Sequence, residues 1–421
     1  MNVLLINPNT YKSPPVPPIG LECIAPCLEN EGHRAEIVDL CFSENLYKDI
    51  DNAMVSFSPD IVGITVRNVE TVLYHTNEFF LDEIKDMVNH VKSNYGLKVI
   101  LGGTGVLTNP EGILDYLNAD FAIAGPGEDE INTLLRNIQS SENTKKIYQG
   151  KYRLNSSCPR KPFKVDYKKY FDAGGIAGFE THKGCSSSCV YCLEANSRVS
   201  FKNVEDVIEE IKTFVVSGYN HFHLCDSEFN ESIEYSDEFC TALKNEGLDI
   251  KWAMYMKPGN FNRKLFKLLK NTGVYLITLT VDSWQKCPEY WSDVERFIFS
   301  AKLWGIKTAV DFLTGFPYED EDKVLEYLDL LRRVQPDSVG VNTYIRLYKS
   351  LRITQIIMND EKLKNNLLGN VDDKTFVKPV FYNHINSEKL SELIKGDTLF
   401  RIEGLEKGVN YSRIITEAIP Q

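Results

Sequence analysis

Three cysteines lie close together near the middle of the chain, and their spacing is C-x3-C-x2-C. They are Cys185, Cys189 and Cys192, in the segment KGCSSSCVYC. Zinc normally takes four protein ligands in two separated pairs, and the chain has no second C-x2-C pair to complete such a site. Soft thiolates at short spacing suit an iron–sulfur cluster, and three of them leave one iron open. The spacing therefore predicts a [4Fe-4S] cluster with an open position, and a structural zinc loop is the alternative.

The residues around the cysteines predict a strand before them and a helix after them. Residues 179–182 have the pattern of a short strand, and residues 204–216 (VEDVIEEIKTFVV) have apolar positions at helical spacing. An aromatic residue, Tyr191, stands directly before the last cysteine. This combination resembles the radical S-adenosylmethionine (SAM) superfamily. The resemblance implies that SAM binds the open iron, that Tyr191 lies beside its adenine, and that the reduced cluster cleaves SAM to a 5′-deoxyadenosyl radical.

Length, charge and cysteine content indicate the class of protein. A chain of 421 residues suggests two or three domains. It has no apolar run long enough for a transmembrane helix and no basic leader with a cleavage site, so we expect no membrane association. Ten cysteines without a secretion signal fit a reducing, cytoplasmic location. The net charge of −12 argues against a nucleic-acid partner, because such a partner calls for a basic surface.

Residues 1–145 alternate short apolar strands with helices. The expected strands are 3–7, 35–40, 61–66, 99–102 and 121–124, and the expected helices are 19–31, 79–95, 111–117 and 128–138. Regular alternation predicts an α/β fold with a doubly wound parallel sheet that is covered on both faces. Ligands of such sheets bind at the carboxyl ends of the strands.

Glycine-rich turns follow two of these strands. They are Gly102-Gly103-Thr104-Gly105 and Gly125-Pro126-Gly127-Glu128, and a proline-rich loop at 14–20 precedes the first helix. Glycine allows the backbone to approach a ligand closely. Together these features resemble the Rossmann-like cobalamin-binding domain that precedes the radical SAM domain in the B12-dependent branch of the superfamily. The cobalamin contacts that we expect are Asn9, Arg67, Asn68, Gly102, Gly103, Thr104, Gly105, Gly125, Gly127 and Glu128.

The chain departs from many B12 proteins because it lacks the D-x-H-x-x-G motif whose histidine coordinates cobalt. The loop after the first strand, residues 8–13, contains no histidine. Arg67 and Asn68, at the end of the third strand, could lie under the corrin instead, an arrangement similar to the tryptophan 2-C-methylase type. An arginine keeps its proton and does not coordinate easily, so it would disfavour a lower cobalt ligand. The alternative for Arg67 is a surface residue that caps the strand or pairs with an acid.

Residues 146–176 have a broken polar pattern that predicts a linker, and strand–helix alternation resumes over residues 177–350. The expected strands after the cysteine loop are 221–224, 251–256, 274–279, 308–313 and 338–342. Together with the strand before the loop they fit the partial (β/α)6 barrel of the radical SAM family. Such barrels carry their chemistry at the carboxyl ends of the strands.

Polar residues follow these strands, and the resemblance implies roles for them. Asp226 and Glu228 would hold the amino group of SAM, and Lys257 its carboxylate. Asp282 and Ser283 would bind the ribose, while Arg346 would face SAM and Tyr344 the substrate. The alternative for each residue is a cap or a salt bridge at a strand end, which is common and contributes little energy. No residue is assigned as a catalytic acid or base.

Residues 351–421 form a charged, partly helical extension. We expect this extension to have α/β character, to close the open barrel and to contribute to the substrate pocket. The chain shows no basic β-barrel of the kind appended to tRNA methylthiotransferases.

These features predict a B12-dependent radical SAM methyltransferase. It would transfer a methyl group from methylcobalamin to a carbon of a small molecule or peptide, and it would use SAM and a [4Fe-4S] cluster. An electron donor such as flavodoxin or ferredoxin is implied, and polar methyl transfer without a radical is a variant. Three alternatives remain. The first is a B12-linked radical SAM reaction without methyl transfer, such as a rearrangement, an oxidation or a cyclisation. The second is a cobalamin-free radical SAM enzyme, and the third is a non-catalytic carrier.

Overall fold

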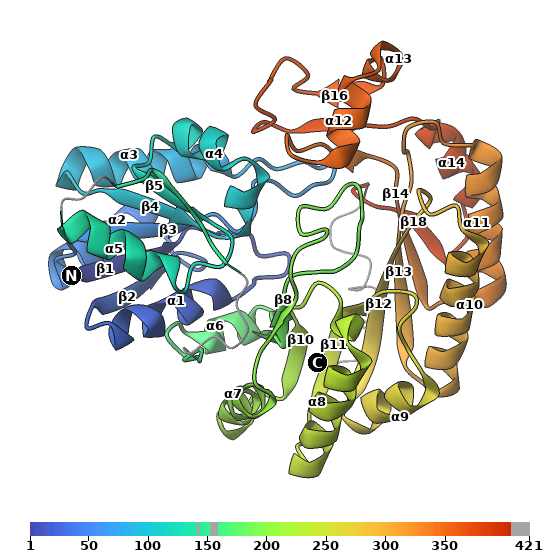
Figure 1. Cartoon of the computed structure of the whole chain (residues 1–421), viewed down its shortest axis with the longest axis horizontal. Helices are drawn as coiled ribbons and strands as arrows, with labels where there is room; N and C mark the ends of the chain where they lie inside the picture. The colour runs from blue at the N-terminus through green and yellow to red at the C-terminus, as the bar shows by residue number, and fades with distance from the viewer. Residues whose placement is uncertain (141–143, 152–158, 406–421) are drawn as a thin grey trace.

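The computed structural model describes residues 1–140, 144–151 and 159–405, and it consists of two α/β units that lie side by side (Figure 1). The N-terminal residues form one unit, in blue and teal, and the middle of the chain forms the other. The segment 352–369, in orange, lies over the junction between them. In the described part of the chain, every helix is too short or too polar to cross a membrane.

The N-terminal unit is built on a six-stranded parallel sheet with the order β2-β1-β3-β4-β5-β6. Its strands are β1 (Asn2–Asn7), β2 (Arg34–Asp39), β3 (Ile61–Thr65), β4 (Val99–Gly102), β5 (Phe121–Ala124) and β6 (Ile147–Gln149). Its helices are α1 (Ile19–Asn30), α2 (Leu46–Phe57), α3 (Leu81–Tyr95), the 3-10 helix η1 (Thr104–Thr108), α4 (Pro110–Leu117) and α5 (Glu130–Gln139).

Strand residues alternate between the two faces of this sheet. Leu4 and Ile6 pack against α2, α3 and α4, whereas Val3 and Leu5 pack against α1 and α5. Helices therefore cover both faces, and the predicted doubly wound sheet is confirmed. Three elements are additional to the predicted ones: α2, β6 and the 3-10 helix η1, which begins in the predicted glycine-rich turn. Polar residues in α2 obscure the helical spacing of its buried positions, and β6 has only three residues and lies within the segment predicted as a linker.

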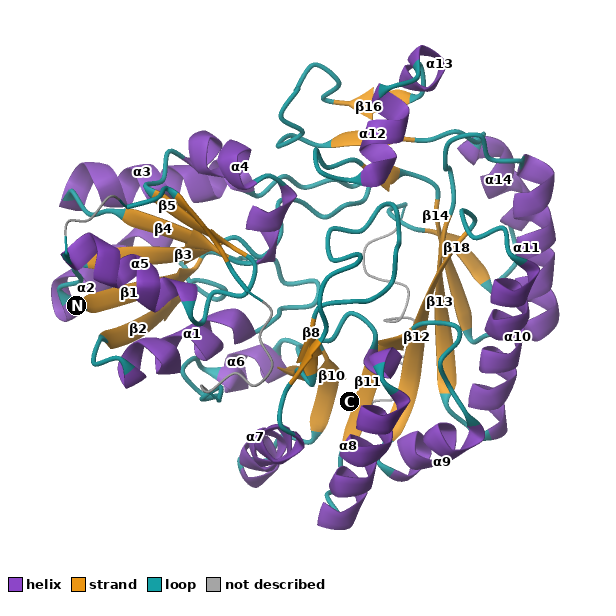
Figure 2. Cartoon of the chain, in the orientation of Figure 1, coloured by secondary structure: helices purple, strands orange, loops and turns teal. Residues whose placement is uncertain are grey.

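The second unit is a seven-stranded parallel sheet with the order β18-β14-β13-β12-β11-β10-β7. Its strands are β7 (Ala177–Phe179), β10 (His221–Leu224), β11 (Lys251–Met256), β12 (Val274–Asp282), β13 (Lys307–Leu313), β14 (Ser338–Asn342) and β18 (Phe400–Ile402). Its helices are α7 (Val204–Val216), α8 (Ile233–Glu246), α9 (Arg263–Asn271), α10 (Pro288–Leu303) and α11 (Glu321–Val334). Figure 2 shows these helices along the outer side of a curved sheet, so the predicted partial barrel is confirmed, and β18 adds a seventh strand to its edge.

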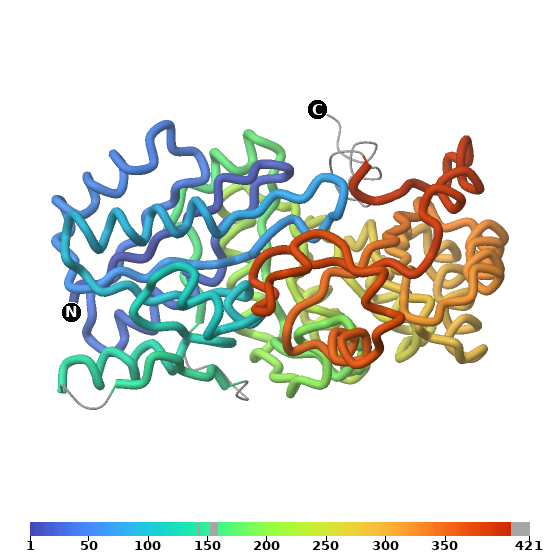
Figure 3. Tube along the Cα trace, turned by 90° about the horizontal axis from the view of Figure 1, so that it is seen from above, coloured from blue at the N-terminus to red at the C-terminus, as the bar shows by residue number. Residues whose placement is uncertain are grey.

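The C-terminal extension contacts both units. Its helices are α12 (Arg352–Met358), α13 (Glu361–Lys364) and α14 (Ser387–Ile394). Its strands β17 (Val380–Tyr382) and β16 (Leu367–Gly369) form a small antiparallel sheet with β15 (Ile345–Arg346), which directly precedes the extension. Val377 packs into the core of the N-terminal unit, and the Asn109 side chain donates to the Thr375 carbonyl at 2.8 Å. Seen from above, this extension lies against the N-terminal unit (Figure 3). β18 of the extension pairs with β14 at one edge of the barrel sheet, and β7 forms the other edge, so the expected closure of the barrel stays a prediction. The part of the extension after residue 405 falls outside the described residues.

A buried arginine joins the two units from the predicted linker. Arg160 donates to Glu22 of α1 at 2.7 and 2.9 Å and to Glu210 of α7 at 2.7 Å. It also donates to the Gly178 carbonyl of β7 at 2.6 Å and contacts the Tyr167 hydroxyl of the short helix α6 (Tyr167–Asp172). Buried charges need such complete pairing, because an unpaired one is costly. Arg160 therefore fixes α1 of the first unit against the barrel.

Candidate functional site

The three cysteines lie in one loop, between β8 (His182–Lys183) and β9 (Ser200–Phe201), which pair as a short antiparallel hairpin. Cys185 is buried and Cys192 is exposed, and burial raises the pKa of the Cys189 thiol to about 12. Backbone bonds shape the loop: the amide of Cys192 donates to the Cys189 carbonyl at 3.2 Å, and the amide of Cys185 to the Ser197 hydroxyl at 2.8 Å.

The donor set fits an iron–sulfur cluster in its chemistry. Three thiols from one loop are soft ligands, and each must lose its proton when a metal binds. Among the described residues, however, no three His, Cys, Asp or Glu side chains converge closely enough to hold a metal ion. The three cysteines therefore lie in one loop, but their side chains do not converge on a common centre.

Tyr191 and Asp282 form a buried pair beside this loop. Asp282 ends β12, and its Oδ2 accepts from the Tyr191 hydroxyl at 3.1 Å, while its Oδ1 is buried without a partner. Burial raises the pKa of Asp282 to about 6. The neighbouring Ser283 hydroxyl donates to Glu319. A buried acceptor without a donor is costly in a folded chain, so Asp282 is suited to accept from a bound hydroxyl or amine.

Glu228 presents a second acceptor of this kind. It follows β10, its Oε2 is buried without a partner, and burial raises its pKa to about 8. Lys257 lies on the same side but is engaged: it pairs with Glu231 at 2.9 Å and contacts the Ser186 hydroxyl of the cysteine loop at 3.2 Å.

Asp226 is fully used within the protein. It accepts from the Thr181 amide at 2.8 Å and contacts His182 Nδ1 at 3.0 Å, and its second oxygen also accepts from the Thr181 hydroxyl. In this structure Asp226 therefore fixes the chain that enters the cysteine loop, and it offers no oxygen without a partner.

Two of the predicted site residues lie apart from this group. Arg346 is buried in an ion pair with Glu70 of the N-terminal unit, at 3.0 Å from Nε to Oε1. Tyr344 stacks on Tyr74, with 4.3 Å between the ring centroids, and His75 lies edge-on to it. The structure thus joins both residues to the loop after β3.

A cavity of about 410 Å³ lies between the two units. Both sheets present carboxyl ends of strands to it, as the rule for parallel sheets predicts. Seven of the ten expected cobalamin contacts line it: Arg67, Gly102, Gly103, Thr104, Gly125, Gly127 and Glu128. Asn9, Asn68 and Gly105 are not part of the lining. Gly105 instead donates its amide to the Val66 carbonyl at 2.8 Å.

Two lining glycines adopt backbone conformations that other residues rarely adopt. Gly103 has φ +96° and Gly125 has φ +93°. A Cβ atom on Gly103 would lie 2.6 Å from the Val66 carbonyl oxygen. The cavity wall on this side is therefore bare backbone held close to β3, which suits contact with a large flat ligand.

The barrel side of the cavity contains charged and polar residues that the sequence did not indicate as site residues: Glu180, His182, Lys183, Glu194, Cys225 and Ser227. Lys183 pairs with Glu128 across the units, and Lys202 approaches Glu180 at 3.2 Å. Positions 180 and 183 fall next to the cysteine loop, which is the single sequence signal that could have drawn attention to them. Their partners are fixed by tertiary packing alone.

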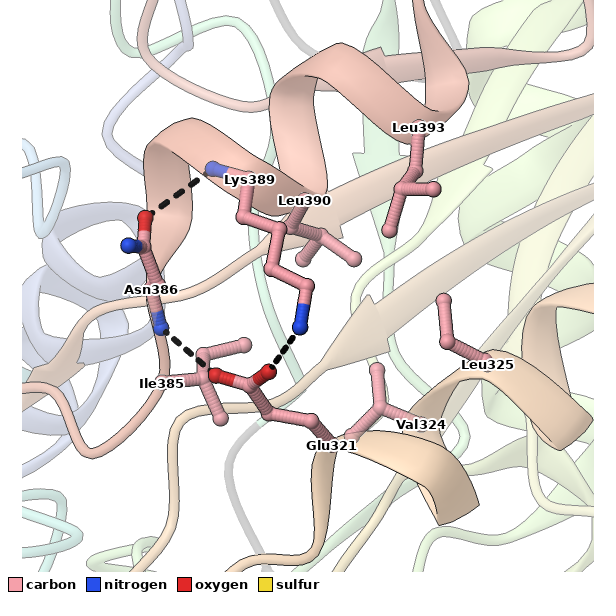
Figure 4. Close-up of a pocket in the computed structure, with 8 residues that line it drawn as sticks. All are labelled: Glu321, Val324, Leu325, Ile385, Asn386, Lys389, Leu390 and Leu393. Atoms are coloured by element: carbon pink, nitrogen blue, oxygen red, sulfur yellow. Dashed lines mark hydrogen bonds and ion pairs between the residues drawn. The ribbon is translucent and has the colours of Figure 1, made fainter.

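A second, smaller pocket lies between α11 and α14 (Figure 4). Its volume of about 20 Å³ is enough for about one water molecule. Glu321 pairs with Lys389 at 2.6 Å over apolar side chains such as Val324 and Leu390. This pocket belongs to the packing of the extension on the barrel and is too small for a cofactor.

Each of the two units that line the cavity matches a known protein family. Residues 13–135 match the B12 binding domain, and residues 179–331 match the radical SAM superfamily. The chain therefore carries a B12-binding domain followed by a radical SAM domain. These matches confirm the predicted family and the predicted order of the two domains.

Two curated relatives align with most of the chain. Tryptophan 2-C-methyltransferase of Streptomyces laurentii is 23% identical, over 82% of this chain and 72% of the relative. An uncharacterized methyltransferase of Pyrococcus horikoshii is 24% identical, over 94% of this chain and 91% of the relative.

Two solved structures share the fold. The radical SAM methyltransferase TsrM from Kitasatospora setae, determined with cobalamin and a [4Fe-4S] cluster bound, has a TM-score of 0.85 at 22% identity and covers 96% of this chain and 93% of TsrM. The cobalamin-dependent SAM radical enzyme OxsB has a TM-score of 0.74 at 15% identity and covers 94% of this chain and 66% of OxsB. The arrangement of the two domains in this chain therefore matches a known architecture.

Proposed function

We propose that this chain is a cobalamin-dependent radical SAM methyltransferase that methylates a carbon atom of a small molecule. The observation that carries the proposal is the shared cavity, which the glycine turns of the B12-binding domain and the start of the cysteine loop both line. The methyltransferase relatives support the reaction type.

The residues present fit the three cofactors of this branch. When bound, the cluster and SAM would supply an electron and a methyl group, and cobalamin would carry the methyl group. Cys185, Cys189 and Cys192 would hold the cluster, which leaves one iron open for SAM. Asp282 and Glu228 would bind SAM, because each has a buried oxygen without a donor and carboxylates suit hydroxyls and an ammonium group.

The B12-binding domain would hold the corrinoid through backbone and shape. Gly102, where a Cβ atom would meet nothing within 4 Å, leaves room for a flat ring, and Arg67 is exposed at the cavity. A protonated guanidinium has no lone pair for cobalt, so Arg67 would leave the lower cobalt face without a protein ligand from this loop. Asp226, which the sequence suggested as a SAM contact, would act instead by holding Thr181 and His182 ahead of the cysteine loop.

We propose tryptophan as the first substrate to test. The Streptomyces laurentii relative is a tryptophan methyltransferase, and a TsrM structure contains tryptophan as substrate. Tyr344 and Tyr74 offer aromatic surface beside the barrel, which supports a planar substrate. A flavodoxin or ferredoxin would be the electron donor.

The test uses anaerobically reconstituted protein, a chemical reductant, corrinoid, tryptophan and SAM with a ¹³C-labelled methyl group. We expect S-adenosylhomocysteine and a labelled methyl group on a carbon of tryptophan, both measured by mass spectrometry. Formation of 5′-deoxyadenosine without S-adenosylhomocysteine would contradict methyl transfer and favour another B12-linked radical reaction. Formation of S-adenosylhomocysteine with a different labelled acceptor would reject tryptophan alone.

A further inference from the structure

Arg346 joins the C-terminal extension to the loop that follows β3, rather than to the SAM residues. It is carried by β15, and its Nε lies 3.0 Å from Glu70 Oε1. We propose that Arg346 and Glu70 are positioning residues for the corrinoid side of the cavity, which they control by holding the loop that carries Arg67. This inference rests on the proposed cobalamin-dependent function.

The Arg346–Glu70 pair is buried and fully hydrogen-bonded. The side chains are 4% and 0% exposed, respectively. Arg346 also donates to the carbonyls of Phe376 and Val377 at 3.1 and 3.3 Å, and the Tyr348 hydroxyl donates to Glu70 Oε1 at 2.9 Å. Removal of one partner from such a pair leaves a buried charge without compensation. The loop after β3 is therefore held in one place for as long as the pair is intact.

The glycine turn holds the start of the same loop. The amide of Gly105 donates to the Val66 carbonyl at 2.8 Å, and the absence of a side chain at Gly103 lets the two segments meet. Arg67 stands between Val66 and Glu70, exposed at the cavity. Its backbone thus lies between a contact to the glycine turn and a contact to Arg346, so movement at Glu70 would move Arg67.

Further contacts bring the extension onto the B12-binding domain at several points. Val377 lies in the core of that domain, and Asn109 donates to the Thr375 carbonyl at 2.8 Å. Near the end of the described chain, Gly404 comes close to Leu73 of the loop after β3. In Figure 3 one part of the extension reaches the B12-binding domain, and the rest lies over the barrel. The extension is therefore placed to transmit a change at Arg346 to residues 66–80.

The test compares Arg346→Met with the wild-type chain in three measurements. Deuterium uptake of residues 66–80 is measured by mass spectrometry on the full chain without cofactors, and we expect it to rise. Corrinoid affinity is measured by titration, and we expect it to fall by about tenfold, as supporting residues around a metal site typically show. SAM affinity of the reconstituted protein should not change.

Two results would overturn the proposal. One is a loss of SAM affinity with unchanged corrinoid affinity, which would make Arg346 a SAM residue. The other is unchanged uptake and unchanged affinities. If Arg346→Met does not fold, Tyr348→Phe removes a single hydrogen bond to Glu70, and it should shift uptake and corrinoid affinity in the same direction by a smaller amount.

Arg332→Met is the matched control. Arg332 of α11 holds the same extension to the barrel, with its Nε 3.0 Å from Asp397 Oδ2. Its replacement should leave the uptake of residues 66–80 and corrinoid affinity unchanged, and a rise equal to that of Arg346→Met would reject a specific role for Arg346. If the wild-type chain binds no corrinoid, the proposed function fails, whereas the uptake measurement still decides whether Arg346 holds the loop.

Discussion

The two sheets meet at one cavity, but they present different chemistry to it. The B12-binding domain contributes backbone at Gly102, Gly103 and Gly125 beside two charged side chains, whereas the barrel contributes several titratable side chains such as Glu180 and Lys183. Backbone contacts fix shape and carry no charge that changes with pH. The charged side chains on the barrel side are buried, which is energetically costly. A bound ligand or a change in pH should therefore alter stability more on the barrel side than on the glycine side.

The largest expected effect is on the barrel side, at the cluster loop. Cys189→Ala removes one of three thiolate ligands, so we expect the reconstituted protein to lose most of its iron and all methyl transfer. Iron analysis and the absorbance spectrum measure this change. Cys287→Ala is the control, since Cys287 is an exposed cysteine outside the loop. Full iron content in Cys189→Ala would contradict the assignment of the ligands.

A substitution at Glu228 tests whether buried charge on the barrel side makes stability depend on pH. Its pKa is raised from 4.5 to about 8, so the folded chain binds its proton more tightly than the unfolded chain, and stability falls as the pH rises from about 4.5 to 8. In protein without cofactors, Glu228→Gln should therefore be more stable than wild type at pH 8, by about 4 kcal/mol, and nearly equal to it at pH 4.5. Urea unfolding at both pH values measures the difference.

Glu231→Gln should change the pH dependence of stability in the opposite direction. Burial raises the pKa of Glu231, but hydrogen bonds from Ser186 and Lys257 outweigh burial, and the net pKa is lowered. Its stabilising contribution is present above the ordinary pKa of a glutamate and is lost as the pH falls through the lowered value. Equal pH dependence in the two variants would contradict the electrostatic account of the barrel side.

Gly103→Ala tests the backbone account of the other side. A side chain at φ +96° is strained, and its Cβ would meet the Val66 carbonyl oxygen, so we expect a loss of about 2 kcal/mol of stability together with weaker corrinoid binding. Gly102→Ala is the matched control for stability, because a Cβ there would meet no atom within 4 Å. If both variants are equally stable, the backbone conformation at position 103 does not require a glycine.

The smallest effect is expected where the two sides meet directly. Lys183 and Glu128 pair across the domains, with side chains 29% and 15% exposed. A double-mutant cycle with Lys183→Gln and Glu128→Gln should give a coupling of at most about 1 kcal/mol, because partly exposed pairs contribute little. A coupling several times larger would mean that this pair, rather than the buried arginines, holds the domains together.

The comparison also explains which parts of the site the sequence could predict. The three cysteines and the glycine turns are local patterns, in which neighbours in sequence act together, and they identified the loop and the cavity wall. The partner of Arg346 is Glu70, in the loop after β3 of the other domain, and no local pattern pairs them. Asp226 was expected at SAM for its position after a strand, but its partners Thr181 and His182 are set by strand packing.

The fold was more accessible than the contacts between its parts. Alternating apolar strands and amphipathic helices predicted both parallel sheets. The three-residue strands β6 and β18 escaped prediction because so few residues carry no clear period, although β18 forms one edge of the barrel sheet. The buried role of Arg160 was hidden for a different reason, since a basic residue in a polar segment normally faces solvent.

The central claim is that one cavity serves a corrinoid and a cluster-bound SAM together. Its most direct test is the cofactor content of the chain, purified without oxygen and reconstituted with iron, sulfide and cobalamin. Iron analysis and corrinoid extraction should give about four irons and about one corrinoid per chain. Gly103→Ala should reduce the corrinoid and leave the iron unchanged. Four irons without corrinoid in the wild-type chain, even with excess cobalamin, would contradict the claim and leave a radical SAM enzyme that works without cobalamin.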